Sequence, residues 1–560
     1  MEKLILILSL FVLDPCKFAI GQSTSMHIDP GKLYIDANDL LYKDIKPGDT
    51  LFFNAGNRDY LLVKNFLGAP GKPIVMINSG GEVIIDTDHY FGISIQNCRY
   101  FRFTGTGVQN LTYGFKIKRV TNGAGMGIGY LSSDMEIDHV SIENTSIGGL
   151  YAKTDPDCTL ISVRGTFTQY NTNIHDNYIS NAGNEGLYVG STKFFGQTVQ
   201  CNGQDKLLLP SLLDGVKIYN NIIRYSGWDG IQVSSASKNC QIFNNTVLFD
   251  SQSEIGSQMS GILIGGGTKC ICFNNFISQG KGDGIEIHGL GSSMIYNNII
   301  VDAGRSYKPD DISVMKYGIF VTDVSVQNDS SFYIQHNDII NPKSDGIRFS
   351  SVISKKNLIA ANVILSPGNF DYYENGNTSF KGKDAYVMFQ NAASDVTLEN
   401  NYFAQNADNA GFKSLNMQSV DDFKLTANSP LIDMATFDKK ISFDFLGITR
   451  PQGTKSDIGA FEYPIITSSI KPQNASLNKI KLLQNPTKDY LIFSMPGEKN
   501  YEVYLGIYSL SGKLVIQLKQ WEISSENQTI MANISYIESG IYIYSIRAGE
   551  YASSGKFIKR

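Results

Sequence analysis

The chain has 560 residues, a formal net charge of −5 and a pI near 5.8. This length accommodates one large domain and a smaller one. The weakly acidic balance excludes a general nucleic-acid-binding surface, because such surfaces carry extended basic patches.

Residues 1–21 are typical of a secretory signal peptide. Lys3 supplies the positive charge, residues 4–13 form the apolar core, and Ala19-Ile20-Gly21 offers a cleavage site. Cys16 would be the acylated residue of a lipoprotein, but the preceding Asp14-Pro15 does not match a lipobox. No later apolar run reaches the roughly 20 residues of a transmembrane helix, so we expect no membrane span in the mature chain.

Two short motifs recur at a fixed offset through the middle of the chain. The first reads Asn-x-Ile/Val/Phe, and Gly-Ile/Leu-x-Ile/Val/Phe follows nine positions later, as from Asn177 to Gly186 (186 − 177). Without an insertion, one Asn follows the last by about two dozen residues, as from Asn221 to Asn245 (245 − 221 = 24). Short β-branched runs broken by Gly, Asn, Asp and Ser at this period predict a solenoid of three short strands per coil.

The repeated Asn and Gly residues are predicted to stack as columns. The Asn side chains should form a hydrogen-bonded ladder at one corner, and the Gly residues should open a strand where the corner needs unusual φ. The Asn column comprises Asn221, Asn245, Asn275, Asn298, Asn337, Asn362 and Asn401, and the Gly column Gly186, Gly230, Gly261, Gly284, Gly318 and Gly346.

These repeats resemble right-handed parallel β-helix proteins, a group that includes pectate lyase-like polysaccharide lyases and several glycoside hydrolases. The resemblance implies an all-β chain with the β-helix over residues 91–410. The turns Gly48-Asp49-Thr50 and Gly68 to Ile74 resemble the entry of bacterial β-helix proteins, so residues 22–90 are expected to form the cap and first coils. Residues 411–463, with Arg450 and Asp457-Ile-Gly-Ala-Phe-Glu462, resemble a closing module.

Residues 468–560 resemble the C-terminal sorting domain of type IX secretion cargo, a small β-sandwich. The match lies at Asn485-Pro486, Gly512-Lys513, Gly540-Ile-Tyr542 and the basic terminus Lys559-Arg560. It implies the type IX machinery as a partner and a secreted or surface location on a Gram-negative bacterium. We expect the mature protein to be monomeric.

The cysteines divide into two kinds. Cys240, Cys270 and Cys272 fall on inward strand positions and are expected to be buried thiols. Cys158 and Cys201 lie in long insertions of adjacent coils, so an exported protein can join them in a disulfide. No Cys/His grouping has zinc-ligand spacing.

Long insertions rise on both flanks of the strand that follows each repeated Gly, which predicts a groove floored by its outward residues. Period-2 alternation assigns Tyr188, Gln232, Leu263, Glu286, Phe320 and Arg348 to that floor, Lys153 and His288 to the next row, and Lys116 and Tyr151 to earlier coils. We assign catalytic roles to Lys153, Tyr188, Glu286 and His288, and substrate binding to Lys116, Tyr151, Trp228, Gln232, Phe320 and Arg348.

Three functions remain open, all on extracellular polysaccharide. The first is β-elimination on a uronic-acid glycan, with Lys153 or Tyr188 as base and Lys116 or Arg348 neutralising the carboxylate. Ca²⁺ could supply part of that charge. The second is glycoside hydrolysis by two carboxylates among Glu286, Asp229 and Asp283. The third is non-catalytic glycan binding by a surface adhesin.

The acidic residues just before the repeated Gly can also be read as structural. Asp-Gly is a common turn pair, and this interpretation is favoured for Glu185, Asp229, Asp283 and Asp345.

Overall fold

The computed structural model describes residues 25–369, 385–391 and 393–464, and in the C-terminal part residues 480–494, 503–509, 514–518, 523–526, 529–535, 537, 539–548 and 551–560. The expected signal peptide, residues 1–21, lies outside the described residues.

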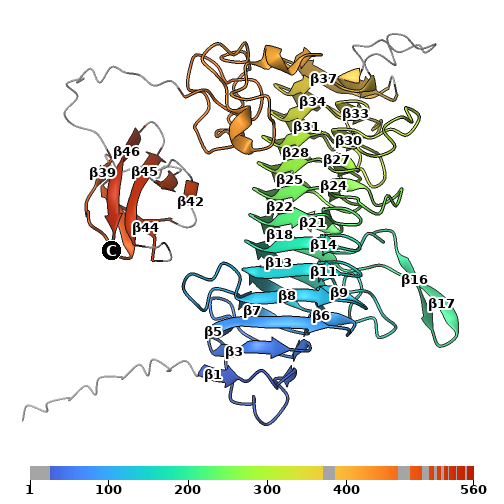
Figure 1. The fold of residues 1–560 in the computed structure, drawn as a ribbon, viewed down its shortest axis with the longest axis vertical. Coiled ribbons are helices and arrows are strands. Elements are labelled where there is room, and N and C mark those ends of the chain that lie inside the picture. Colours follow the sequence, from blue (N-terminus) through green and yellow to red (C-terminus); the bar gives the residue numbers. More distant parts are fainter. Residues whose placement is uncertain are drawn as a thin grey trace, which may run out of the picture.

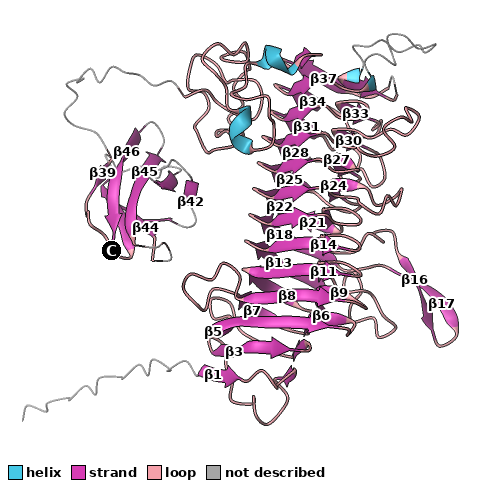
Figure 2. Ribbon diagram, viewed as in Figure 1, coloured by secondary structure: helices cyan, strands magenta, loops and turns pink. Residues whose placement is uncertain are grey.

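Parallel strands stack into a long solenoid that runs upward in Figure 1, and Figure 2 shows how strands dominate it. One face is a 12-stranded parallel sheet. Its strands are β2 (Tyr34–Asp36), β4 (Leu61–Lys64), β6 (Phe91–Gln96), β9 (Ala124–Gly129), β12 (Leu150–Ala152), β15 (Leu187–Val189), β20 (Ile231–Val233), β24 (Ser260–Ile264), β27 (Asp283–Ile287), β30 (Ile319–Val321), β33 (Ile347–Phe349) and β36 (Val387–Phe389).

The other two faces are joined by the long strands β3 and β5 into one 24-stranded sheet. The first of these faces holds β1 (Ser25–Ile28), β3 (Thr50–Arg58), β5 (Ile74–Thr87), β7 (Arg99–Thr104), β10 (Ser133–Asp138), β13 (Thr168–His175), β18 (Leu212–Tyr219), β21 (Ala236–Lys238), β22 (Cys240–Phe243), β25 (Cys270–Phe273), β28 (Ser293–Tyr296), β31 (Phe332–Gln335), β34 (Asn357–Ala360) and β37 (Val396–Glu399). The second holds β8 (Phe115–Val120), β11 (Val140–Thr145), β14 (Tyr178–Ala182), β19 (Ile222–Arg224), β23 (Thr246–Leu248), β26 (Phe276–Ser278), β29 (Ile299–Val301), β32 (Asp338–Ile340), β35 (Val363–Leu365) and β38 (Tyr402–Ala404).

The predicted Asn ladder is confirmed at the corner between these two faces. The side-chain amide of Asn221 donates to Oδ1 of Asn245 at 3.0 Å, and the same bond joins every step from Asn177 to Asn401 at 2.9–3.0 Å. Each amide also donates to a backbone carbonyl of the previous coil, and five of the eight donate to one of their own coil as well, as Asn245 does to Ile218 and Phe243. The ladder therefore satisfies buried polar groups that the corner would otherwise leave unpaired.

The Gly column is present, but the reason predicted for it is wrong. None of the six glycines of the column has a positive φ. A Cβ at Gly230 would instead lie 2.6 Å from the carbonyl oxygen of Gly261, and the other five meet a comparable oxygen at 2.5–2.8 Å. Close stacking of neighbouring coils, rather than backbone conformation, requires glycine here.

The core is a column of inward Ile, Val and Leu side chains with almost no exposed surface. Cys240, Cys270 and Cys272 belong to it as buried free thiols, as expected. A second apolar cluster lies under the closing segment, which contains the 3-10 helices η2 (Ala407–Ala410) and η3 (Val420–Phe423). The Arg450 guanidinium is fully buried there and pairs with Glu462 at 2.8 Å, so these residues hold the closing segment together.

The C-terminal part consists of two four-stranded antiparallel sheets around their own apolar cluster. One sheet holds β39 (Lys481–Leu482), β40 (Tyr490–Ser494), β44 (Thr529–Asn533) and β43 (Ile523–Glu526). The other holds β42 (Leu514–Leu518), β41 (Val503–Ser509), β45 (Gly540–Ala548) and β46 (Tyr551–Lys559). The all-β class, with a β-helix and a small antiparallel domain, is as predicted.

Candidate functional site

The outward row predicted from alternation exists on the 12-stranded sheet. Register pairs its members one strand after another, and their inward neighbours, such as Leu187 and Ile231, are fully buried. The row runs Tyr151, Tyr188, Gln232, Leu263, Glu286, Phe320 and Arg348. Strand pairing therefore lines up residues that lie up to 197 positions apart (348 − 151).

Lys116 does not belong to this row, which corrects the prediction. It lies on β8, in the 24-stranded sheet, and its ammonium pairs with Glu82 at 2.6 Å. Phe115 occupies the corner position of its coil, in register with Val140, and the glycine equivalent to Gly149 is Gly125, ten residues later, on β9.

Tyr151, Lys153 and Tyr188 form one group, in which Tyr151 and Lys153 are partly exposed and Tyr188 is 8% exposed. The Tyr151 hydroxyl donates to Glu185 Oε2 at 2.8 Å, and its ring meets the Tyr188 ring edge-on at 5.5 Å. The Lys153 ammonium lies 5.2 Å from the centre of the Tyr188 ring and 2.9 Å from Asp155 Oδ1. The group thus combines a cation, two phenols and a buried carboxyl.

The charge states in this group follow from burial and its neighbours. Burial lowers the pKa of Lys153, but facing Tyr188 and Asp155 outweigh it, so the pKa is raised and the ammonium stays protonated. Burial and the Glu185 charge raise the pKa of Tyr151, which keeps its phenol protonated. Burial also raises the pKa of Glu185.

Glu286 and His288 form a second group on the same face. His288 Nε2 lies 2.8 Å from Glu286 Oε1, and the side chains are 28% and 17% exposed respectively. Glu286 is three strands away from Tyr188, which corresponds to about 15 Å. The two groups can therefore contact different sugar units of one polysaccharide, but they cannot act on the same glycosidic bond.

The other predicted binding residues differ in how much surface they offer. Gln232 is 1% exposed and its Oε1 is buried without a hydrogen-bond partner, whereas Trp228 and Phe320 are partly exposed. Arg348 pairs with Asp345 at 2.8 Å and faces the Tyr317 ring at 5.4 Å. The Gln232 side chain is therefore covered by its neighbours, and the Arg348 side chain is held by residues of the 12-stranded face.

The acidic residues before the repeated glycines are at most 4% exposed, which agrees with the structural interpretation. Ser260 donates to Asp229 at 2.7 Å, and Lys316 pairs with Asp283 at 2.9 Å. Burial raises the pKa of Asp229 well above its usual range, and that of Asp283 to about 6. The charge of Glu286 contributes to both shifts, so it lies within electrostatic reach of these carboxyls.

Sequence reasoning missed Lys316 and Thr192. Lys316 ends a long loop and is 9% exposed, and Thr192 donates its backbone N–H to the Tyr188 hydroxyl at 3.1 Å. Both belong to insertions that lack the repeat pattern, and no sequence signal locates their contacts.

The insertions after Lys153 and Tyr188 flank this face. The second contains a hairpin of β16 (Gln197–Cys201) and β17 (Gln204–Leu208), which projects from the solenoid in Figure 1. The predicted disulfide is confirmed, because Cys158 and Cys201 are bonded with their Cα atoms 5.5 Å apart. It fastens the hairpin to the loop that follows Lys153.

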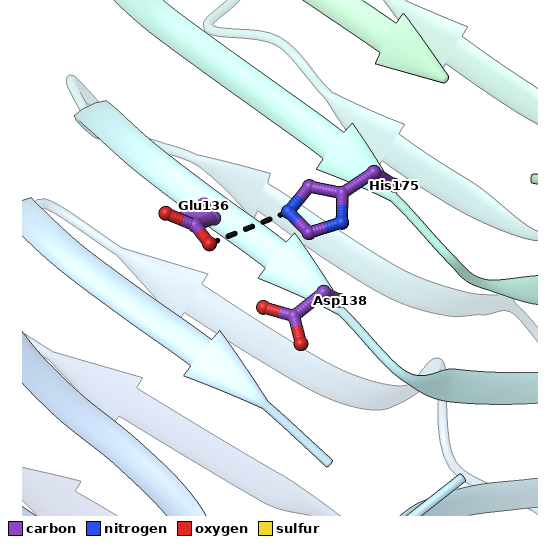
Figure 3. A group of neighbouring side chains, drawn as sticks. All are labelled: Glu136, Asp138 and His175. Atoms are coloured by element: carbon purple, nitrogen blue, oxygen red, sulfur yellow. Dashed lines mark hydrogen bonds and ion pairs between the residues drawn. The ribbon is translucent and has the colours of Figure 1, made fainter. Parts of the chain in front are cut away.

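Among the described residues, Glu136, Asp138 and His175 offer three metal-ligand atoms within 4.8 Å of one another (Figure 3). Arg102 Nε already contacts both carboxylates, at 3.1 and 2.9 Å. Burial opposes the charge of His175, but hydrogen bonds to Asp176 and Glu136 raise its pKa to about 9. Two cationic side chains thus neutralise the group, which fits an ion-pair network better than a metal site.

Two family models match parts of the chain. Residues 199–368 match the right-handed β-helix region, and residues 484–560 match the secretion system C-terminal sorting domain. The chain thus contains a right-handed β-helix and a type IX sorting domain, and the latter directs it to the outside or surface of a Gram-negative cell. No helix among the described residues has the length and apolar character to span a membrane.

Several solved structures resemble the chain distantly. Pectate lyase Pel9A is 13% identical, with 79% of this chain and 97% of that chain covered and a TM-score of 0.45. An alginate lyase from Paenibacillus sp. str. FPU-7 is 14% identical, with coverages of 58% and 95% and a TM-score of 0.38. The GH136 lacto-N-biosidase from Eubacterium ramulus is 10% identical, with 68% of each chain covered and a TM-score of 0.41.

At these scores the likenesses carry no information on activity. No curated protein matches the chain.

Proposed function

We propose that this exported protein binds an acidic, uronic-acid polysaccharide on the outward face of its 12-stranded sheet and cleaves it by β-elimination. The observation that carries the proposal is the ammonium of the partly exposed Lys153, which faces the ring of Tyr188 at 5.2 Å, where Tyr188 is 8% exposed. β-Elimination needs a cation for the uronate carboxylate and a nearby group that accepts the C5 proton.

The charge states divide these roles between the two residues. Lys153 remains an ammonium because its pKa is raised, so it suits carboxylate neutralisation rather than proton abstraction. Tyr188 is then the proton acceptor, with its hydroxyl oriented by the backbone N–H of Thr192 at 3.1 Å. Of the two bases considered from the sequence, this assignment keeps Tyr188 and gives Lys153 the role of neutralising the carboxylate instead.

The reaction balances with groups that surround Lys153. Tyr188 reacts as its phenolate: it takes the C5 proton, the C4–C5 double bond forms and the C4–oxygen bond breaks, and the restored phenol returns its proton to solvent before the next turnover. Tyr151 stays protonated, because burial and the Glu185 charge raise its pKa, and it can give its proton to the departing oxygen. Glu286, His288 and Phe320 would bind further sugar units along the row.

Glycoside hydrolysis is the second candidate, supported by the carboxyls around Glu286. Burial and the Glu286 charge raise the pKa of Asp229 and Asp283. A raised pKa keeps a carboxyl group protonated near neutral pH, as the general acid of a glycoside hydrolase requires. Both Asp side chains are at most 4% exposed, so this candidate requires substrate to reach a covered group.

A panel of acidic and neutral polysaccharides tests the proposal. Products are measured by the ultraviolet absorbance of unsaturated uronate and by reducing ends, and binding is measured by affinity electrophoresis. Unsaturated product that disappears in Lys153→Ala and Tyr188→Phe supports elimination. Reducing ends alone indicate the hydrolase, binding without product an adhesin, and no binding at all contradicts the proposal.

A further inference from the structure

One corner of the solenoid changes residue type immediately before the coil of Lys153. At the end of β4 and β6, the corner residues are Asn65 and Asn97, with φ of 65° and 51°. Their amides form a small ladder, in which Asn97 donates to Asn65 and Asn65 donates to Asp36, each at 2.8 Å. Asn suits this position because it tolerates the left-handed conformation better than other side chains.

Tyr130 occupies the same corner in the next coil. Gly129 pairs with Gln96, so Tyr130 follows β9 as Asn97 follows β6. Tyr130 has the same φ of 51°, and its side chain is 67% exposed. Among the described residues the Tyr130 side chain has no hydrogen bond or ring contact, so the aromatic ring contributes nothing visible to folding.

The Tyr130 corner is tied to the candidate site. The backbone N–H of Leu131 donates to Thr154 Oγ1 at 3.0 Å, and the N–H of Lys153 donates to the Ile128 carbonyl at 2.9 Å. Tyr130 is therefore one coil, about 5 Å along the axis, from the residue that follows Lys153.

The floor beside Tyr130 is lowered. β9 presents Gly127 and Gly129 outward, where the neighbouring coil presents Tyr151 and Lys153. A Cβ placed on Gly127 would meet no atom within 4 Å, so open space lies above Gly127, whereas one on Gly129 would lie 2.6 Å from the Lys153 carbonyl oxygen. Ser94, bonded to the Gln96 amide at 3.1 Å, bounds the recess on the side away from Tyr151.

We propose that Tyr130 is the aromatic platform of an additional sugar subsite, adjacent to the one at Lys153 and Tyr188. A pyranose unit of the same glycan lies over Gly127 and stacks on the Tyr130 ring, and Tyr151 bounds it on one side. The proposal rests on the proposed function, because the sugar in this subsite is the unit of the glycan next to the one held by Lys153. An exposed aromatic ring favours the apolar face of a sugar, and its hydroxyls remain free to bond to Ser94.

The test compares Tyr130→Asn with the wild-type full-length protein. Asn restores the residue of the two preceding coils and fits the left-handed corner, so the melting temperature should stay equal or rise. The probes are oligogalacturonates and oligomannuronates of increasing length, titrated by calorimetry. We expect a roughly three- to tenfold loss of affinity for long oligomers and little change for the shortest oligomer that binds.

Two further variants separate the ring from the backbone. Tyr130→Phe keeps the platform and should keep the affinity. Tyr100→Asn is the control, because Tyr100 is also left-handed, with φ of 51°, but is the second residue of β7, on another face.

Equal affinity of Tyr130→Asn and wild type for every length, or an equal loss in Tyr100→Asn, overturns the subsite. If the wild type binds none of the oligouronides, the proposed function fails and the subsite with it. That outcome is distinguishable, because it appears before any substitution is made.

Discussion

The Lys153 ammonium lies over the ring of Tyr188, 5.2 Å from its centre, although 35 positions separate the two residues in the sequence (188 − 153). The contact exists because β12 and β15 are adjacent strands, with Tyr151 in register with Tyr188. The long insertion between these strands leaves the solenoid as loops and returns in register. An insertion between two strands can therefore add loops beside the sheet without changing which residues of the two strands pair.

The first prediction concerns this pair. Lys153→Ala should reduce turnover on the acidic polysaccharide by about 10²-fold or more, because the ammonium neutralises charge that develops only in the transition state. Tyr188→Phe should cost a comparable factor by removing the proton acceptor, within the range of about 10²–10⁴ typical of acid–base groups. Initial rates of unsaturated product measure both.

The control for Lys153→Ala is Lys118→Ala, which removes an exposed lysine of β8 on the 24-stranded sheet. Its rate should equal that of the wild type. Equal rate losses in the two variants, together with unchanged polysaccharide binding by Lys153→Ala, would place the active site on another face of the solenoid.

The second prediction concerns the disulfide. The double substitution of Cys158 and Cys201 by Ser should expose the β16–β17 hairpin to proteases, because the covalent link to the loop after Lys153 is lost. The melting temperature should fall by only a few degrees, since the link joins surface loops rather than core strands. Limited proteolysis followed by mass mapping locates the cuts.

Cuts confined to residues 154–166 and 191–211 agree with this role. An unchanged cleavage pattern would mean that the loops are held by their other contacts, such as the Arg164 guanidinium over the Phe194 ring at 4.4 Å.

The third prediction concerns the Asn ladder. Asn245→Ala should lower the free energy of unfolding by about 3–5 kcal/mol, because it leaves several buried backbone and amide groups without partners. Asn245 donates to two carbonyls and to Asn275, and its Oδ1 accepts from the side chain and backbone of Asn221. Urea unfolding followed by circular dichroism gives the difference.

Asn401 provides the internal comparison, because it ends the ladder and is only partly buried. Asn401→Ala should cost less than half as much as Asn245→Ala. Equal costs would show that position in the ladder does not matter.

The sequence was sufficient for the fold because its main signal is periodic. The nine-residue offset from Asn177 to Gly186 fixes which residue of each coil is a corner and which begins a strand, and alternation then gives the inward and outward sides. Tyr188, Gln232 and Glu286 were placed correctly for that reason. Lys116 was misplaced because its coil carries Phe115 at the Asn position, which hides the repeat.

Contacts made by the loops could not be predicted in the same way. Thr192 and Lys316 reach Tyr188 and Asp283 from insertions of irregular length, and their paths depend on tertiary packing. The explanation of the Gly column failed for a related reason: the close approach is a property of two neighbouring coils in contact, and a single repeat does not reveal it.

The fourth prediction is a pH dependence of stability that originates outside the candidate site, at the end of β13 on the 24-stranded sheet. His175 is 9% exposed in its side chain, stacks on Tyr219 at 4.5 Å and contacts Asp176 and Glu136. Burial alone would lower its pKa, but these hydrogen bonds and the Asp138 charge raise it from 6.5 to about 9. The folded state thus binds the His175 proton more tightly than the unfolded state does.

The sign of the effect follows from this difference. Below about pH 6.5 both states are protonated and the stabilisation is fully present, and it is lost progressively as the pH rises from about 6.5 to 9. Over that window the free energy of unfolding should fall by up to about 3 kcal/mol. His175→Phe keeps the stack on Tyr219 but cannot titrate, so its melting temperature should change less between pH 6 and 9 than that of the wild type. Parallel curves for the two proteins would assign the pH dependence to other groups.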